Sequence, residues 1–467
     1  MNEDDSEQIA AMMARLGYSL VASESDADVV FLNTCSVRAK PEHKAKSKLG
    51  ELRILKREKP DLIVAVCGCM AQKEGERIRK LAPFVDMIVG TANVSSIPSL
   101  LQEVGAGRGR GSALELPRCV EDELTLPGRV DRVSKLKAFV PIMYGCDNFC
   151  AYCVVPFTRG RERSRPAADI LAEVEVLAAG GCKELTLLGQ NVNSYGRAFA
   201  APNPSHPEPV EGCSVGECTL RQAQGAKVRL ESRDMPMDFP SLLRLLNGVA
   251  GIERIRFITS HPKDLSDDLI RTMAELPKVC EHIHLPVQSG SDVVLERMNR
   301  RYAAAQYMNR LAKLREAVPG IAVTTDLIAG FAAETEEDFQ ATLDLVAEAR
   351  FDEAFMFAFS PMFGTAAASL PDQLPNPVKH ERLLRLIELQ NGITAEINQS
   401  QIGRVFEVLV ESLSPRDPSK VTGLTRTNKT MNFPGGAELI GSTVGVRAVR
   451  PFIWGFAGET RNADERG

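Results

Sequence analysis

Apolar and polar stretches alternate along the first 128 residues in the pattern of buried strands joined by helices. Three apolar, β-branched runs, "ADVVFLNTCSV", "DLIVAVCGCMAQ" and "DMIVGTAN", are separated by polar stretches with helical composition. A strand that is buried on both faces reads as a continuous apolar run, as in a parallel sheet covered by helices. Residues 1–128 are therefore predicted to form a doubly wound α/β domain, with ligand sites at the carboxyl ends of its strands.

The alternation is more regular between residues 136 and 375. Six strand candidates, from "AFVPIMYG" to "EAFMFAFS", alternate with helical patterns such as "AADILAEVEVLAAGG" and "TEEDFQATLDLVAEA". This alternation predicts a partial (β/α)6 barrel. Polar residues cluster just after each strand, at the end of the barrel where enzymes of this architecture carry their chemistry.

Two further segments complete the predicted α/β architecture, and one does not fit it. Residues 376–401 have the pattern of a long connecting helix, and residues 402–467 contain short β-rich runs typical of a small β-barrel. Residues 201–237 are rich in Pro, Gly and polar side chains and show no periodicity. We expect this last segment to be a disordered insertion in the barrel.

Composition narrows the class of protein. The chain has 467 residues and no run of about 18 apolar residues, so several domains and no membrane span are expected. The acidic start "MNEDDSEQIAAMM" is unlike a secretory signal, so a cytoplasmic location is expected. The net charge of −5 means that a nucleic-acid partner would have to bind local basic patches. In a reducing cytosol, the eleven cysteines are free thiols, metal ligands or catalytic groups.

Three of these cysteines stand close together in "YGCDNFCAYC". Cys146, Cys150 and Cys153 give the spacing C-x3-C-x2-C, and none of the six histidines lies nearby. A structural zinc site needs four ligands, whereas three thiolates can bind three irons of a cubic cluster and leave the fourth iron open to a small molecule. We interpret the motif as an iron–sulfur site; a zinc site and plain structural thiols are the alternatives.

Many phrases of the sequence resemble the radical S-adenosylmethionine (SAM) methylthiotransferases. They include "NTCSVR", "CGCMAQ", "YGCDNFCAYCVVPFTRGRERSRP", "LLGQNVNSYG", "LPVQSGSD", "MNRRY" and "DLIAGFAAETEEDF", and they span nearly the whole chain outside 201–237. The resemblance implies an N-terminal methylthiotransferase domain, a radical SAM barrel and a C-terminal TRAM RNA-binding domain. "NTCSVR" and "PFTRGRERSR" favour the branch of the family that acts on isopentenylated adenosine in tRNA.

The resemblance also implies an activity. The enzyme would methylthiolate C2 of N6-isopentenyladenosine at tRNA position 37, with SAM, two 4Fe-4S clusters and an electron donor such as flavodoxin or ferredoxin, as a monomer. Close alternatives are a threonylcarbamoyladenosine in tRNA or a ribosomal-protein aspartate as the target. Two more distant alternatives are a tRNA-binding protein without sulfur insertion and a zinc-stabilised RNA-binding module.

The second cluster of the family lies in the N-terminal domain and also has three cysteine ligands. Cys35 and Cys69 match two of them. The third stands in a "GCQMN" motif at the end of the first strand, and this chain begins "MNEDDSE", which aligns with the last two letters of that motif. We therefore expect the first strand and one ligand to be missing, with Cys67 as a poor substitute.

The resemblance extends to further candidate site residues. Tyr152 resembles the aromatic residue that lies along the SAM adenine. Short polar groups at strand ends are expected to bind the ribose and methionine parts of SAM, and the fifth-strand motif is expected to meet the adenine; these residues are Gln190, Asn191, Ser260, Gln288, Ser289, Asp326 and Gly330. The basic side chains expected to contact RNA or SAM are Arg159, Arg161 and Arg163 after the cluster loop and Arg426 and Lys429 in the TRAM-like segment.

Overall fold

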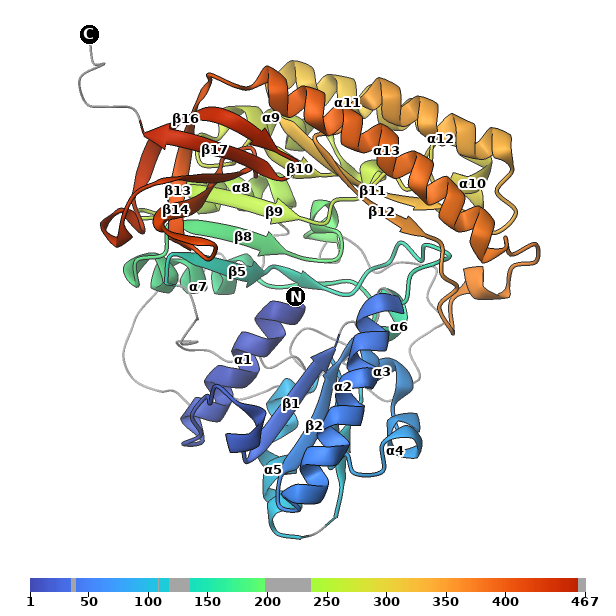
Figure 1. Cartoon of the computed structure of the whole chain (residues 1–467), viewed down its shortest axis with the longest axis vertical. Helices are drawn as coiled ribbons and strands as arrows, with labels where there is room; N and C mark the ends of the chain where they lie inside the picture. Colours follow the sequence, from blue (N-terminus) through green and yellow to red (C-terminus); the bar gives the residue numbers. More distant parts are fainter. Residues whose placement is uncertain (35–38, 108, 117–134, 198–236, 461–467) are drawn as a thin grey trace.

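The computed structural model describes residues 1–34, 39–107, 109–116, 135–197 and 237–460. It has three parts, an N-terminal α/β domain, a central half-open barrel and a C-terminal β-barrel (Figure 1). Within the described residues, no helix combines the length and apolar character needed to cross a membrane. The predicted insertion at 201–237 falls almost entirely on residues outside the described ranges.

The N-terminal domain is a four-stranded parallel sheet in the order β1 (Val29–Thr34), β2 (Ile63–Gly68), β3 (Met87–Val89) and β4 (Gly111–Ala113). One face is covered by α1 (Asn2–Arg15) and α5 (Ile97–Gly105), whose apolar residues pack on Ala65, Met87 and Val89. The other face is covered by α2 (Ala39–Glu58), α3 (Cys69–Glu74) and α4 (Arg77–Leu81). Burial on both faces explains the continuous apolar runs of the sequence.

The central barrel contains two parallel three-stranded sheets. One has the order β5 (Lys137–Pro141), β8 (Glu184–Leu188), β9 (Arg254–Ile258), and the other has the order β10 (His282–His284), β11 (Ala322–Ala329), β12 (Glu353–Ala358). An isolated bridge between Ile255 and Val279 links the two sheets. Helices cover the outside, namely α7 (Ala167–Ala179), α8 (Phe239–Asn247), α9 (Asp267–Glu275), α10 (Asp292–Arg297), α11 (Ala304–Ala317) and α12 (Glu336–Ala349).

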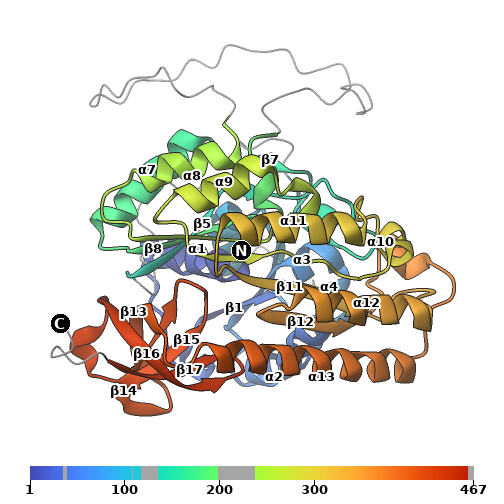
Figure 2. The ribbon, with the colours of Figure 1, turned by 90° about the horizontal axis from the view of Figure 1, so that it is seen from above.

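The chain then runs along α13 (Asn376–Ser400), which packs on β12 and α12, into a closed five-stranded barrel (Figure 2). Its strands are β13 (Val405–Ser414), β14 (Asp417–Thr425), β15 (Thr430–Pro434), β16 (Thr443–Phe452) and β17 (Gly455–Thr460). Their alternating residues, such as Val408, Val410, Phe433 and Phe456, fill the barrel interior. The predicted α/β fold class with a C-terminal β-barrel is confirmed.

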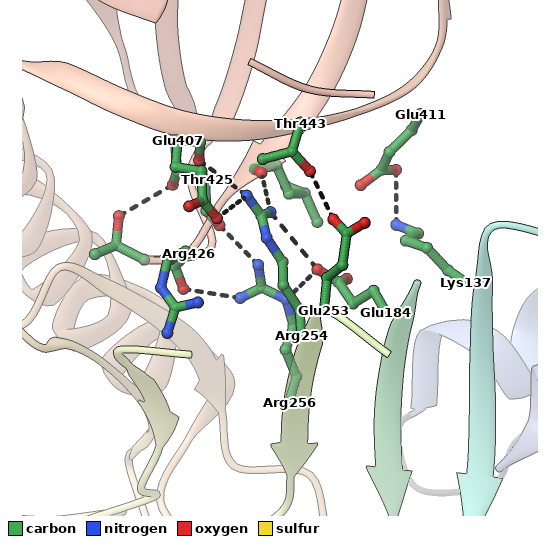
Figure 3. A network of polar contacts seen from close by, with 12 residues as sticks. Lys137, Glu184, Glu253, Arg254, Arg256, Glu407, Glu411, Thr425, Arg426 and Thr443 are labelled. Atoms are coloured by element: carbon green, nitrogen blue, oxygen red, sulfur yellow. Dashed lines mark hydrogen bonds and ion pairs between the residues drawn. The ribbon is translucent and has the colours of Figure 1, made fainter. Parts of the chain in front are cut away.

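The C-terminal barrel is docked on the amino ends of the central strands by a network of arginines (Figure 3). Arg254 donates to the carbonyl of Leu424 at 2.7 Å and to a carboxylate oxygen of Glu407 at 2.9 Å. Arg256 donates to the Thr425 carbonyl at 2.7 Å and forms an ion pair of 3.0 Å with Glu184. The C-terminal barrel therefore lies at the amino ends of the central strands, opposite their carboxyl ends.

Candidate active site

The three-cysteine loop leaves the barrel after β5 and is shaped by a short hairpin. β6 (Met143–Tyr144) pairs with β7 (Arg163–Ser164), and α6 (Val155–Thr158) closes the loop between them. Gly145 has a φ of +72°, and a Cβ at this position would overlap the carbonyl of Arg161. Only glycine fits this backbone, because the left-handed region is open to it at no steric cost.

Cys146, Cys150 and Cys153 lie close enough to influence one another electrostatically. Burial, with the neighbouring thiols, raises the pKa of Cys146 to about 11 and that of Cys153 to about 12. Buried thiols of this kind ionise only beside a strong positive charge, such as iron. In the described ranges, no three His, Cys, Asp or Glu side chains converge closely enough to hold a single metal ion.

This donor set fits an iron–sulfur cluster. Sulfurs that bind three different irons lie further apart than ligands of one zinc ion, each of which would be about 2.3 Å from the metal. All three donors are thiols on one loop of eight residues, from Cys146 to Cys153. The loop can therefore provide three corners of a cubic cluster, and a fourth corner would remain for a small molecule.

Arg300 fixes this loop from the interior of the protein. Its guanidinium donates to Cys150 Sγ at 3.4 Å, to the Tyr152 hydroxyl at 3.3 Å, to the Tyr302 hydroxyl at 3.0 Å and to the Pro286 carbonyl at 2.8 Å. Arg300 is 4% exposed. A planar fork with several donors can hold four groups at once, which a lysine cannot do. Arg300 lies in the motif "MNRRY", which contributes to the family resemblance, but its contact with the three-cysteine loop was not predicted.

Tyr152, the candidate for stacking on SAM, is half-buried beside the apolar cluster that contains Val294, Met298 and Phe331. Its hydroxyl accepts the hydrogen bond from Arg300, and burial raises its pKa well above the ordinary range. The tyrosine therefore stays neutral and braces the cluster loop. Its stacking on SAM stays a prediction.

Several buried polar atoms on or after the central strands β8, β9 and β11 have no hydrogen-bond partner in the described structure. They are Gln190 Oε1, Asn193 Oδ1 and Nδ2, Ser260 Oγ, His261 Nε2 and Asp326 Oδ1. Burying such an atom without a partner costs roughly 1–3 kcal/mol, so this set fits a site that receives a polar ligand. Asn193 and His261 were not predicted, although Asn193 lies in the motif "LLGQNVNSYG" and His261 follows the end of β9 by three residues.

The remaining candidates shape the same end of the barrel through internal contacts. Asn191 donates to Asp264 at 2.7 Å and accepts from the backbone N–H of His261 at 3.1 Å, so its amide is occupied. The hydroxyls of Ser289 and Thr342 lie 3.1 Å apart, which ties the loop after β10 to α12.

Two further candidates stand where the backbone is unusual. Gln288 is buried and has a φ of +72°, which is rare for a residue with a side chain. Gly330 has a φ of +76° and is crowded by Lys379, so that a Cβ would collide with this lysine. The backbone of Gly330 therefore requires glycine, whether or not it contacts a ligand.

Cys69 lies where the N-terminal domain meets the central barrel domain, which carries the three-cysteine loop and is called the cluster domain below. It is the first residue of α3, it is buried, and its helix packs against α6. Arg159, from the cluster domain, hydrogen-bonds Cys69 and pairs with Asp5 at 2.5 Å. Thr91 also donates to the Thr158 carbonyl at 2.5 Å across this interface. The two domains thus meet around Cys69.

The other two thiols considered as N-terminal ligands are Cys35 and Cys67. Cys35, the second predicted ligand, lies outside the described residues. Cys67 is part of the apolar layer beneath α1, and burial raises its pKa to about 12. This position favours packing over a role as a substitute ligand.

Most of the basic residues expected to contact RNA have internal partners. Arg163 donates to the carbonyls of Arg159 and Arg161, and it is buried like Arg159. Arg426 forms an ion pair of 2.7 Å with Glu281 at the domain interface, and Lys429 is 1% exposed. Arg161 is the accessible member, although it pairs with Asp147.

Residues 140–346 match the radical SAM superfamily, residues 1–90 match the uncharacterized protein family UPF0004, and residues 399–450 match the TRAM domain. The chain is 45% identical to the tRNA-2-methylthio-N(6)-dimethylallyladenosine synthase of Moorella thermoacetica, over 98% of this chain and 96% of that protein. It is also 45% identical to the synthase of the same name from Acetivibrio thermocellus, over 98% of this chain and 88% of the relative.

Proposed function

This chain belongs to the radical SAM methylthiotransferases, an enzyme family, and we propose that it converts N6-dimethylallyladenosine (isopentenyladenosine) at tRNA position 37 to its 2-methylthio form. One observation carries the proposal: the three thiols and the unpartnered polar atoms share the carboxyl end of one barrel. This arrangement supports a cluster and SAM side by side. The target carbon has no leaving group, so acid–base groups alone would not activate it.

Cys146, Cys150 and Cys153 would hold the first cluster, and Arg300 keeps their loop in place. With SAM, the cluster supplies radical chemistry at an unactivated carbon. The polar atoms of Gln190, Asn193, Ser260 and Asp326 would orient SAM by hydrogen bonds. The loop is half-buried and would limit the access of water, which protects a reactive species from side reactions.

A second cluster in the N-terminal domain is part of the proposal, with Cys69 and Cys35 as ligands. Support comes from the position of Cys69, which faces the cluster domain and contacts Arg159. A cluster held there would lie next to the interface where the substrate base has to enter.

The substrate base is stacked in the anticodon loop and must leave the stack to reach a barrel. The C-terminal TRAM barrel is proposed to hold the tRNA, with Arg161 as an accessible basic contact near the cluster loop. The enzyme is proposed to act as a monomer and to receive electrons from a flavodoxin or ferredoxin. The threonylcarbamoyl and ribosomal-protein targets are less favoured, because both relatives described above carry the dimethylallyladenosine name.

The test is anaerobic reconstitution followed by incubation with SAM, a low-potential reductant and tRNA that carries dimethylallyladenosine. Mass spectrometry of the nucleosides is expected to show the 2-methylthio product. Transfer to threonylcarbamoyladenosine alone would overturn the substrate assignment. Iron analysis is expected to give about eight irons per chain for two clusters, whereas about four would remove the second cluster.

A further inference from the structure

A surface cavity of about 480 Å³ lies between α11 and the turn η6 (Pro262–Asp264) that follows β9. Four of the described residues that line it are cationic, and no Asp or Glu is among the lining residues. The cations are Lys263, Arg301, Arg310 and Lys313. Gln306 and Asn309 add amide groups on the same side of α11, because residues three, four and seven apart share one helix face.

These cations differ in their partners. Lys263 pairs with Asp264 at 2.9 Å, and Arg310 and Lys313 share Asp267 at 2.5 and 3.2 Å. Arg301 forms no hydrogen bond or ion pair within the described part of the chain, and its φ is +59°. The left-handed region is uncommon for a residue with a side chain, so the surrounding structure has to hold Arg301 in this conformation. The backbone thus holds one unpaired arginine at the cavity.

The cavity shares a wall with the candidate active site. Arg301 directly follows Arg300, which contacts Cys150. Tyr302 lines the cavity, donates to the Val287 carbonyl at 2.8 Å and packs edge-on against His261 with ring centroids 5.6 Å apart. A group bound in the cavity would therefore lie beside the residues that surround the proposed SAM site.

We propose that this cavity binds a phosphate of the RNA strand next to the target nucleoside. The inference rests on the proposed function, because it names where that substrate is held. Phosphate is the fitting ligand, since it is anionic, offers several acceptor oxygens and matches the arginine fork. Arg301 has no partner within the described residues, unlike most of the basic residues identified from sequence, so it supplies at this cavity the local positive charge that a chain of net charge −5 needs.

The test uses the reconstituted full-length protein and an anticodon stem–loop RNA, with binding followed by fluorescence anisotropy at several salt concentrations. The double variant Arg301→Gln and Lys313→Gln is expected to bind about tenfold more weakly. The slope of log K against log salt is expected to fall by about 0.7 for each phosphate contact that is lost. Arg301→Lys keeps the positive charge and loses the guanidinium fork. Its RNA affinity is expected to lie between those of the wild type and the double variant, because part of the binding energy comes from the charge.

Arg350 provides the matched control. It is also an exposed arginine in the left-handed region, with φ +46°, but it pairs with Glu396 at 2.7 Å and precedes the amino end of β12. Arg350→Gln is expected to keep the wild-type affinity and slope. Unchanged binding by the double variant, or an equal loss in the control, would overturn the phosphate site. If the wild-type protein itself binds no RNA, the proposed function fails instead.

Discussion

The two ends of the central barrel are built from the same strands and have opposite character. At the amino end, the buried charged side chains Arg254, Arg256 and Glu184 are paired with each other or with the C-terminal barrel. At the carboxyl end, buried atoms such as Ser260 Oγ and His261 Nε2 have no partner in the described structure. Charged pairs across the interface hold two domains together at the amino end, although Arg254 Nε and Arg256 Nε also lack hydrogen bonds there. The unpartnered polar atoms at the carboxyl end suit a polar ligand.

The largest expected effect is a difference in iron content between variants of two buried cysteines, Cys146 at the carboxyl end and Cys280 at the amino end. Cys146→Ala is expected to remove the first cluster and reduce product formation below detection, because each thiolate binds a different iron. Cys280 is 2% exposed and lies beside Arg256 at the amino end. Cys280→Ala is expected to retain full iron content. Iron analysis and 5′-deoxyadenosine formation provide the measurement, and equal iron loss in both variants would contradict the distinction.

Arg300→Gln is expected to have the next largest effect. It removes the donors to Cys150 and Pro286, and loss of a partner behind a metal ligand typically costs 10–100-fold in metal affinity or activity. Arg297→Gln on the preceding helix is the control, because Arg297 makes an exposed hydrogen bond to the Ala333 carbonyl. The readouts are iron content and the midpoint potential of the cluster. If Arg300→Gln had the iron content and midpoint potential of the wild type, the three-cysteine loop would not need Arg300 to bind the cluster.

At the amino end, the expected effect is on stability. Glu184→Gln leaves the buried Arg256 without its carboxylate, a change that typically costs about 3–5 kcal/mol, whereas Arg254 loses only a 3.8 Å pair and keeps Glu407. Lys137→Ala breaks the more exposed pair with Glu411 and is expected to cost less than about 1 kcal/mol. Thermal unfolding with cluster-loaded protein measures both. Similar losses in the two variants would mean that burial does not set the strength of this interface.

The same contrast explains what could be predicted from sequence. Continuous apolar runs predicted the parallel strands, and the spacing of Cys146, Cys150 and Cys153 predicted a cluster loop, because both depend on local pattern. The roles of Arg159, Arg426 and Arg300 depend on partners about 150 residues away in sequence, such as Asp5, Glu281 and Cys150. A run of arginines has the same appearance in sequence whether its members face RNA or an internal carboxylate.

The smallest expected effects are two pH dependences of opposite sign. Glu162, near the cluster loop, is hydrogen-bonded by Ser194 at 2.7 Å, and burial raises its pKa to about 7. At the amino end, burial alone would raise the pKa of Glu281. The hydrogen bonds and positive charge of Arg426 outweigh this effect and leave the pKa below the ordinary value. The two carboxylates therefore affect the free energy of unfolding differently as pH changes.

A raised folded-state pKa means that the folded protein binds the proton more tightly than the unfolded chain, whose pKa is near 4.5. Glu162 therefore favours folding at low pH, and this contribution, on the order of 1–3 kcal/mol, is lost as pH rises from about 4.5 to about 7. Glu162→Gln is expected to gain stability relative to wild type across that window. Glu281→Gln is expected to show its deficit above about pH 4.5, and the deficit should shrink as the pH falls. Thermal unfolding from about pH 3 to about pH 8 checks both, and parallel curves for the two variants would show that the ends of the barrel do not differ in their electrostatics.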